Sequence, residues 1–578
     1  MNKETLRHLI DVASGRVPAD LCIRGAKVVD VFQKNTFTAD VYITRGLIAG
    51  FGGSGFPAAE SEYDARGRYL VPGLIDSHVH IESSHVSPVA YARLVVPCGT
   101  TTVIADPHEI CNVCGLDGWD YMADSSKDTD LQVFIQIPSC IPTTSFDIGN
   151  AVIDAKEIAR RIDNERVLGL GEMMNYPGVI HAEDQILDKL LVARNAGKMI
   201  DGHSPHIKGA ALDAYLASGI STEHEAVSTE ELQDRIRRGC HVMLRAGSAS
   251  HDLSKLLPGV TPENSHYCLM CSDDLQPSDI VLRGHIDHNI RQAVREGLDP
   301  ISAICMATIN AAECYKLRDR GAIAPGRRAD FLLVDDIQHF RPSHVFIGGK
   351  LCAEYGQYLS EIPHVDSSAV IDRMNVKNFS RERLAMPLKN NKVRTIGILS
   401  HSLVTKEVHA SVSLDREGNW VRDSQDIVKL AVVERHRGTG KIGLGLLSSY
   451  GLHGGAIAMS IAHDSHNIIC AGDSDEDMAA AIQHLISIGG GIVVVKDARI
   501  MGSIRHEIAG LMTDQPGELV ASQLKELGDM AFDTLHIHYG IDPFMTLCFM
   551  ALPVIPKLKL TANGLYDVTH SCFVTTEL

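Results

Sequence analysis

Paired imidazoles and scattered carboxylates are the residues of this sequence that could carry out chemistry. His78 and His80 are separated by one residue, and because alternate side chains of a strand point the same way, both imidazoles would face one side. That spacing is typical of a metal chelate. Further His, Asp and Glu residues follow short apolar runs along the chain, and the most informative are Glu172, His203, His224, Asp273 and Asp274.

These residue types predict a hydrolytic metal centre. Imidazole and carboxylate ligands suit Zn, Mn or Fe(II), and the oxygens of Glu172 could bridge two such ions. A bound metal ion lowers the pKa of water from 15.7 to about 7. Asp273 could accept the proton of that water and return it to a leaving group. We therefore predict catalytic roles for Asp273 and Glu172.

The elements that must position these residues are short strands alternating with helices. Over about residues 70–320 this alternation predicts βα units and a parallel sheet. Eight such strands begin near Tyr69, Thr101, Leu131, Val167, Met199, Gly219, His241 and Tyr267. Eight strands close a (β/α)8 barrel, in which polar groups at the carboxyl ends of the strands meet at one rim. A single histidine at a strand end is more often structural, but an ordered set on strand ends one, four, five, six and eight favours the metal centre.

The flanking sequence predicts two further bodies. Short β-rich runs with glycine turns occur before the barrel and again after it, so these distant segments could form one composite β-sandwich. From about residue 390 the chain alternates strands (442–447, 491–495) with a helix near 476–488. We predict an α/β protein divided into residues 1–70 (N-terminal part of the sandwich), 71–320 (barrel), 321–385 (remainder of the sandwich) and 386–578 (C-terminal α/β domain).

The amino-acid composition limits the kinds of binding partner and the cellular compartment that we expect for this protein. The net charge of −18 argues against a nucleic-acid partner. The sequence contains no run of about 18 apolar residues, the length that a membrane-spanning helix needs. The N-terminus lacks the apolar core of a signal peptide. The fourteen cysteines lie mostly in apolar runs and read as buried thiols in a reducing compartment. We expect a cytoplasmic enzyme with no membrane attachment.

Several stretches resemble the amidohydrolase superfamily and, within it, the adenine deaminase family. Val71-Pro72-Gly73-Leu74-Ile75-Asp76-Ser77-His78-Val79-His80 is similar to the opening motif of the superfamily, and Ile81-Glu82-Ser83-Ser84 to its adenine deaminase form. The other similar stretches cover 105–110, 169–175, 201–205, 271–274, 509–514 and 543–547. The resemblance extends over essentially the full chain.

The resemblance implies hydrolytic deamination of adenine to hypoxanthine and ammonia, a step of purine salvage. It places two divalent ions on His78, His80, Glu172, His203, His224 and Asp273. Glu172 takes the bridging place that a carboxylated lysine fills in many relatives, which favours Mn(II) or Fe(II), with Zn(II) as an alternative. The residues it implies for substrate contacts or an additional ion are Asp274, His108, Glu109 and Glu82. The expected partner is a small purine base, and we expect a homo-oligomer, a dimer or larger.

Two other functions stay open at this stage. A cyclic-amide or N-acyl hydrolase would use the same metal apparatus, and a catalytically silent relative could serve as a metal-containing scaffold. The CxxC pairs at 111–114 and 268–271 are too far apart for a zinc ribbon and read as core packing. The polar runs at 434–437 and 463–467 could form a lid over the barrel mouth, a subunit interface or solvated loops.

Overall fold

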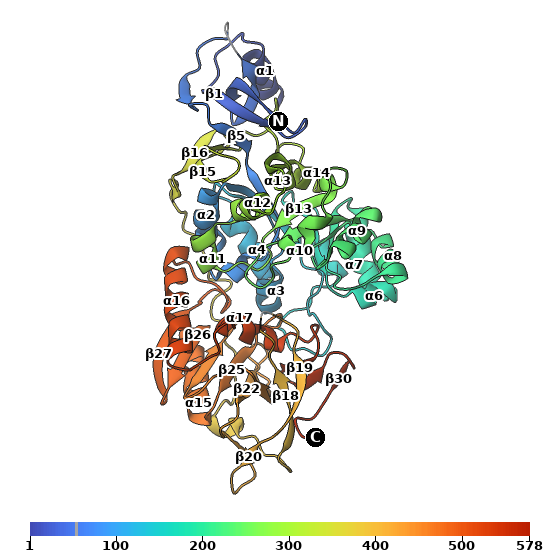
Figure 1. Ribbon diagram of the computed structural model, residues 1–578, viewed down its shortest axis with the longest axis vertical. Coiled ribbons are helices and arrows are strands. Elements are labelled where there is room, and N and C mark those ends of the chain that lie inside the picture. Colours follow the sequence, from blue (N-terminus) through green and yellow to red (C-terminus); the bar gives the residue numbers. More distant parts are fainter. Residues whose placement is uncertain (53–55, 401) are drawn as a thin grey trace.

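The chain forms three bodies stacked along the long axis of the molecule (Figure 1). The computed structural model describes residues 1–52, 56–400 and 402–578. A sheet containing the first strands lies at the top of the view, the barrel lies in the middle, and the C-terminal domain lies at the bottom. The two termini are therefore in the outer bodies, and the barrel lies between them.

The upper body is one nine-stranded sheet made from two distant segments. Its order is β17-β16-β15-β14-β5-β1-β2-β3, with β4 beside β1. β5 and β14 pair antiparallel, with Val71 opposite Leu332, so the strand before the barrel adjoins the strand after it. Helix α1 (Lys3–Ala13) packs on β3. The strands are β1 (Leu21–Asp30), β2 (Asn35–Thr44), β3 (Leu47–Gly52), β4 (Ser61–Asp64), β5 (Tyr69–Pro72), β14 (Phe331–Val334), β15 (Pro342–Ile347), β16 (Lys350–Glu354) and β17 (Gln357–Tyr358).

The middle body confirms the predicted eight-stranded barrel. Its strands form a five-stranded and a three-stranded parallel sheet, β10-β9-β8-β7-β6 and β11-β12-β13. The sheets join where the Ser221 N–H donates to the Ile200 carbonyl at 3.1 Å, and where Val79 bridges Asp273 in parallel. The strands are β6 (Leu74–Val79), β7 (Thr100–Ala105), β8 (Gln132–Ile137), β9 (Val167–Met173), β10 (Met199–Gly202), β11 (Thr222–Glu223), β12 (His241–Arg245) and β13 (Cys268–Cys271).

The predicted start of the first barrel strand is wrong. Residues 69–72 are β5 of the upper sheet, and the barrel strand β6 begins at Leu74. Gly73 separates the two strands, and a Cβ at this position would lie 2.2 Å from Thr101 Oγ1. One continuous apolar run therefore serves two sheets, because the chain turns at a glycine that must pack closely against β7.

Helices surround the barrel, and apolar side chains fill it. Ile75, Ile104, Met243 and Leu269 belong to the buried cluster inside the strands. Ser228 caps α9 as predicted, accepting from the Glu231 backbone N–H. The helical segments are η1 (Ile81–Ser84), α2 (Pro88–Val95), η2 (Val96–Cys98), α3 (His108–Cys114), α4 (Leu116–Ser125), α5 (Ala155–Ala159), α6 (Tyr176–Ile180), α7 (Asp184–Asn195), α8 (Gly209–Ala217), α9 (Thr229–Arg237), α10 (Leu253–Leu256), η3 (Leu257–Gly259), η4 (Ser265–Tyr267), α11 (Pro277–Arg283), α12 (Ile286–Arg295), α13 (Pro300–Met306) and α14 (Ile309–Cys314).

The lower body is a separate mixed sheet with helices. Its order is β19-β18-β23-β22-β25-β24-β26-β27, and α15 covers part of it. The predicted strands near 442–447 and 491–495 and the helix near 476–488 are all present. The elements are η5 (Arg381–Leu384), β18 (Lys392–Gly397), β19 (Lys406–Ser411), β20 (Ser413–Leu414), β21 (Trp420–Val421), β22 (Ile427–Val433), β23 (Ile442–Ser448), β24 (Ala456–Met459), β25 (Ile468–Gly472), α15 (Asp475–Ile488), β26 (Gly491–Lys496), β27 (Arg499–Arg505), α16 (Gly517–Asp533), α17 (Pro543–Cys548), η6 (Phe549–Ala551), β28 (Leu558–Thr561), β29 (Gly564–Asp567) and β30 (Cys572–Phe573).

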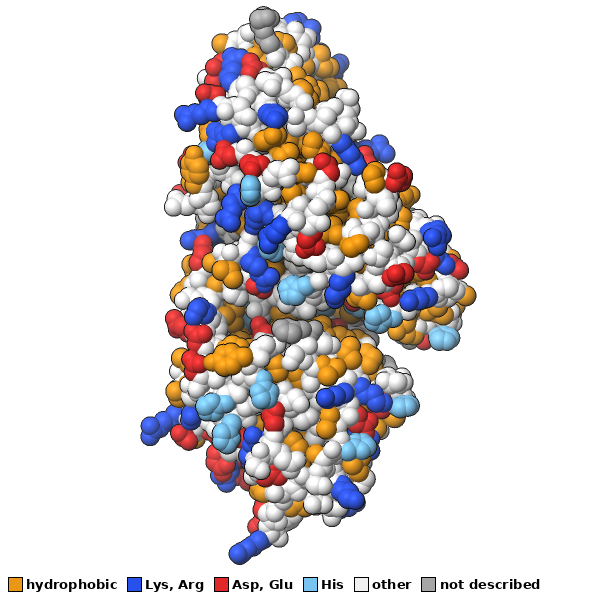
Figure 2. Space-filling view, in the orientation of Figure 1, with side chains coloured by type: hydrophobic (Ala, Val, Ile, Leu, Met, Phe, Trp, Pro, Cys, Tyr) orange, Lys and Arg blue, Asp and Glu red, His pale blue; other side chains and the backbone are white. Residues whose placement is uncertain are grey.

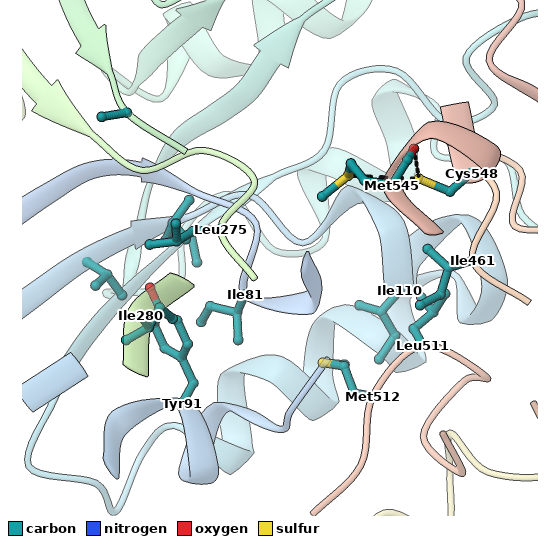
Figure 3. Packing of buried hydrophobic residues seen from close by; sticks show 14 of the residues in the cluster. Ile81, Tyr91, Ile110, Leu275, Ile280, Ile461, Leu511, Met512, Met545 and Cys548 are labelled. Carbon is teal, nitrogen blue, oxygen red and sulfur yellow. Dashed lines mark hydrogen bonds between the residues drawn. The ribbon is translucent and has the colours of Figure 1, made fainter. Parts of the chain in front are cut away.

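The lower body packs directly on the barrel through a shared apolar core. Figure 3 shows Ile110 of the barrel facing Ile461 and Leu511 of the C-terminal domain, and all three belong to one buried cluster. Helix α16 also lies against α11 (Figure 1). Because the core is continuous across the junction, the two bodies are fixed relative to each other.

The distribution of surface charges and the burial of the thiols agree with what the amino-acid composition predicts. Figure 2 shows acidic and basic side chains interspersed over one face of the molecule. All fourteen cysteines lie in the described ranges and are free thiols, and most are buried, including Cys111, Cys114, Cys268 and Cys271. Among the described helices, none is both long and apolar enough to cross a bilayer.

A buried lysine gives the lower body a pH-dependent stability. Lys559 of β28 is fully buried and donates to the carbonyls of Leu403 and Phe549, each at 2.9 Å. Burial lowers the pKa of Lys559 from 10.5 to about 7. Between these two pH values the unfolded chain binds the proton and the folded chain does not, so stability rises with pH in this window.

The Lys559→Met variant is expected to flatten that rise. The shift corresponds to a penalty on the order of 4 kcal/mol at pH 7 and below, which the uncharged side chain does not carry. Melting temperatures of both proteins measured from pH 7 to 10 test this. Equal slopes for the two proteins would contradict the role given to Lys559.

Candidate active site

The carboxyl end of β6 presents two imidazoles to the same buried point. The Nε2 atoms of His78 and His80 lie 3.2 Å apart, and both side chains are buried. His80 Nδ1 lies 2.9 Å from the carbonyl of Asp106, to which it can donate a hydrogen bond. That bond leaves the lone pair of Nε2 directed into the site, as in a metal-ligating histidine.

Glu172, at the end of β9, reaches imidazoles on both sides. Its Oε2 lies 2.7 Å from His203 Nδ1 and 3.1 Å from His224 Nε2. Its Oε1 lies 3.5 Å from His80 Nε2 and 3.3 Å from His108 Nδ1. One carboxylate therefore connects the histidines of β6 with those that follow β10 and β11, which is the placement required of a bridging ligand.

The backbone at Glu172 is held by a buried aspartate. Asp106 Oδ2 accepts from the Glu172 N–H at 2.8 Å. A Cβ on the preceding residue, Gly171, would lie 2.0 Å from that same oxygen. Glycine at 171 thus lets the Asp106 carboxylate approach the strand and fix the position of Glu172.

Asp273 closes the set from the end of β13. Its Oδ1 lies 3.2 Å from His80 Nε2 and 3.5 Å from His78 Nε2. Its Oδ2 accepts from Arg245 Nη1 at 2.7 Å. Asp273 has a φ of 59°, in the left-handed region, which turns its side chain toward the strand ends. The six residues predicted as metal ligands are thus brought to one buried rim.

The site is strongly polarised. Burial opposes ionisation of Asp273 and Glu172, but neighbouring cations outweigh it and hold both pKa values well below the usual range: chiefly Arg245 for Asp273, and His203 and His224 for Glu172. Burial also opposes protonation of His203, yet Glu172 and Glu225 raise its pKa to about 9. Overlapping sets of three donors lie within 4.8 Å of one another, among them His78, His224 and Asp273. This arrangement of anionic oxygens and imidazoles fits divalent cations.

The four residues predicted as substrate contacts lie beside the ligand set. Ser83 Oγ donates to Asp274 Oδ1 at 2.6 Å and lies 3.4 Å from Glu109 Oε1, so it lies between two of them. Glu82 Oε1 accepts from the Ile110 N–H at 3.2 Å. Burial raises the pKa of Glu82 to about 7 and that of Asp274 to about 6, and it also raises the pKa of Glu109. A cluster of weakly acidic carboxyl groups therefore lies next to the metal-ligand set.

Sequence reasoning missed Arg245 and the role of the polar run at 463–467. Arg245 ends β12 and contacts Glu225, Asp252 and Asp273, three carboxylates that its position in the sequence does not reveal. The run at 463–467 is buried, so a solvated loop is excluded there. Its paired histidines, spaced His-x-x-His, were the only signal available in the sequence.

A closed parallel barrel with this ligand set at its carboxyl rim is the architecture of an amidohydrolase. Residues 69–352 match the amidohydrolase family, and residues 402–572 match the adenine deaminase C-terminal domain. The chain is 50% identical over 578 residues to adenine deaminase 2 of Desulfotalea psychrophila, covering 100% of each chain. It is 45% identical over 579 residues to adenine deaminase of Ligilactobacillus salivarius, again covering 100% of each.

The chain belongs to the adenine deaminase family. Among solved structures, a beta-aspartyl dipeptidase from Fervidobacterium islandicum AW-1 is 20% identical, with a TM-score of 0.44. That comparison covers 59% of this chain and 98% of the dipeptidase.

Proposed function

We propose that this protein hydrolyses adenine to hypoxanthine and ammonia. The observation that carries the proposal is the full-length identity of 50% with a curated adenine deaminase, in a chain that has all six predicted ligands on one rim. A cyclic-amide hydrolase would need only the barrel. The match to the adenine deaminase C-terminal domain therefore favours the purine substrate.

The donor set suits two divalent ions. In this proposal the residues that would hold them are His78, His80, Glu172, His203, His224 and Asp273, and Glu172 would be shared by both ions. The carboxylate bridge favours Mn(II) or Fe(II), with Zn(II) as an alternative. Such ions, when bound, supply a nucleophile from water at neutral pH.

The chain's own residues would transfer the proton and bind the purine. Asp273 accepts a proton from the attacking water at Oδ1 and passes it to the departing amino group, while Arg245 holds Oδ2 in place. Glu82, His108, Glu109 and Asp274 contact the purine, since they lie beside the ligand set and offer both donors and acceptors. Burial of the rim keeps bulk water away from these groups.

An adenine assay tests the proposal. Purified protein loaded with Mn(II) is expected to release ammonia from adenine and to shift the ultraviolet spectrum from that of adenine to that of hypoxanthine. Protein stripped by a chelator serves as the control and should be inactive. Failure with Mn(II), Fe(II) and Zn(II), combined with turnover of a cyclic amide or an N-acyl compound, would overturn the choice of substrate.

The proposal extends to the setting of the enzyme. Fourteen free thiols suit the reducing cytoplasm, where adenine deamination would serve purine salvage. We also propose a homo-oligomer, which size-exclusion chromatography with light scattering tests directly.

A further inference from the structure

A segment of the C-terminal domain reaches the carboxylate cluster of the barrel. His463 Nδ1 lies 3.3 Å from Glu109 Oε1, and His466 Nε2 lies 3.9 Å from Glu109 Oε2. All three side chains are buried, and His466 is completely so. The two imidazoles thus flank the two oxygens of one carboxyl group that belongs to the other body.

The ring of His463 is fixed by its own domain. It stacks on Phe549 with the ring centroids 4.4 Å apart and the planes at 14°. The His463 backbone N–H donates to the Cys548 carbonyl at 3.2 Å. With the ring face and the backbone both held, Nδ1 faces Glu109 of the barrel at 3.3 Å, nearer than Asp464 Oδ1 of its own domain at 3.8 Å.

The segment that carries the histidines is tied to both bodies. His436 donates through Nε2 to the Ser465 carbonyl at 2.6 Å within the C-terminal domain. Thr143 Oγ1 donates to Asp464 Oδ2 at 2.7 Å, and Asn467 Nδ2 donates to the Ile148 carbonyl at 2.9 Å. These last two bonds reach the loop after β8 of the barrel. The segment is therefore built into the barrel mouth and is not a free loop.

On the barrel side, Ser83 makes the one hydrogen bond to the Glu109 carboxyl group found among the described residues, and it is long. Glu109 lies in the first turn of α3, and Ser83 Oγ is 3.4 Å from its Oε1. The same hydroxyl makes a shorter bond, 2.6 Å, to Asp274. The contacts from the C-terminal domain are therefore needed to define where the Glu109 carboxyl group points.

The tautomer of His466 argues against a third cation at this cluster. The Ala462 backbone N–H donates to His466 Nδ1 at 3.3 Å, so in the neutral ring the proton is on Nε2. A protonated Nε2 cannot ligate a metal ion, but it can donate to an oxygen. Nε2 has no hydrogen-bond partner in the part of the chain that the structure describes, and Glu109 Oε2 lies 3.9 Å from it.

We propose that His463 is a positioning residue that holds the Glu109 carboxyl group against the edge of the bound purine, with His466 packed beside the other carboxyl oxygen. The C-terminal domain would then complete the substrate site of the barrel, in addition to covering it. This inference rests on the proposed function, because it assigns Glu109 to the purine. Positioning of this kind affects catalysis strongly, since a displacement of about 1 Å can cost ~100-fold in rate.

A double-mutant cycle between the two bodies tests the inference. The His463→Leu variant is expected to lower kcat/KM for adenine by roughly 10- to 100-fold, mainly through a higher KM. In a Glu109→Gln background the same substitution should cost less than about 3-fold, because the group it positions is already altered. The His463→Asn variant places an amide near the former Nδ1 and should recover most of the loss.

The controls separate this role from a structural one. The His453→Leu variant changes an exposed histidine of the same domain and should behave as wild type. A loss for His463→Leu that is equally large in both backgrounds would overturn the inference, as would a third metal equivalent per chain that disappears in His463→Leu. The wild-type rate on adenine, measured first, tests the proposed function alone. The coupling can be measured on whichever substrate the wild type turns over.

Discussion

Replacing Asp273 with asparagine is expected to lower kcat by about 10²–10⁴-fold, the range for loss of a general acid-base group. Asparagine tolerates the left-handed backbone of this position, where φ is 59°. It keeps one oxygen for the metal, while the amide NH2 replaces the oxygen that accepts from Arg245 and that hydrogen bond is lost. The measured result should be a protein with near wild-type metal content and very low turnover of adenine.

The matched control is Asp252→Asn. Asp252 Oδ2 accepts from Arg245 Nη2 at 3.1 Å but is not among the predicted ligands. This variant disturbs the same arginine and should lose less than about 10-fold in kcat, as expected for a supporting contact. Equal losses in the two variants would show that Arg245, and not proton transfer by Asp273, dominates the effect.

The Glu172→Gln variant is expected to lose metal as well as activity. Both oxygens of Glu172 face imidazoles, at 2.7 to 3.5 Å, and an amide supplies neither the charge nor a second acceptor. Removing one partner from a buried charged set costs about 3–5 kcal/mol, so metal retention should weaken by roughly 10²–10³-fold. Metal analysis after dialysis at fixed free Mn(II) measures this directly.

Chelation of the wild type provides the parallel experiment. The stripped protein should regain activity when reloaded, and the ion that restores the highest rate identifies the preferred metal. The Glu225→Gln variant is the control, because Glu225 lies 3.7 Å from His224 without contacting His78 or His80. It should retain both ions. If Glu172→Gln bound two ions as tightly as wild type, Glu172 could not be the bridge.

Much of the fold was predictable because its periodicity is local. The eight barrel strands, the helix at Asp475–Ile488 and the cap at Ser228 follow from short apolar runs and capping residues. The start of the first barrel strand was not predictable in this way. Residues 69–75 form one apolar stretch, and only the close approach of Gly73 to Thr101 shows where one sheet ends and the next begins.

The candidate ligands could be found because barrel topology converts order in the sequence into proximity at one rim. Arg245 and His463 could not, since their contacts depend on tertiary packing. Arg245 meets three carboxylates from separate loops, and His463 meets Glu109 across a junction between two bodies. A residue that contacts a ligand residue from another element has no characteristic sequence spacing relative to it, so the sequence alone does not reveal the contact.

Because β5 pairs with β14, the barrel is an insertion in the upper sheet, and the two points where the chain enters and leaves the barrel are held side by side. The strand that leads into the barrel and the strand that leaves it share a hydrogen-bonded ladder, so neither end can fray without breaking the upper sheet. Amide protons of Leu70 and Leu332 should consequently exchange as slowly as those of the barrel core. Loss of the hydrogen bonds between β5 and β14 would therefore be expected to displace His78, which lies only a few residues after β5.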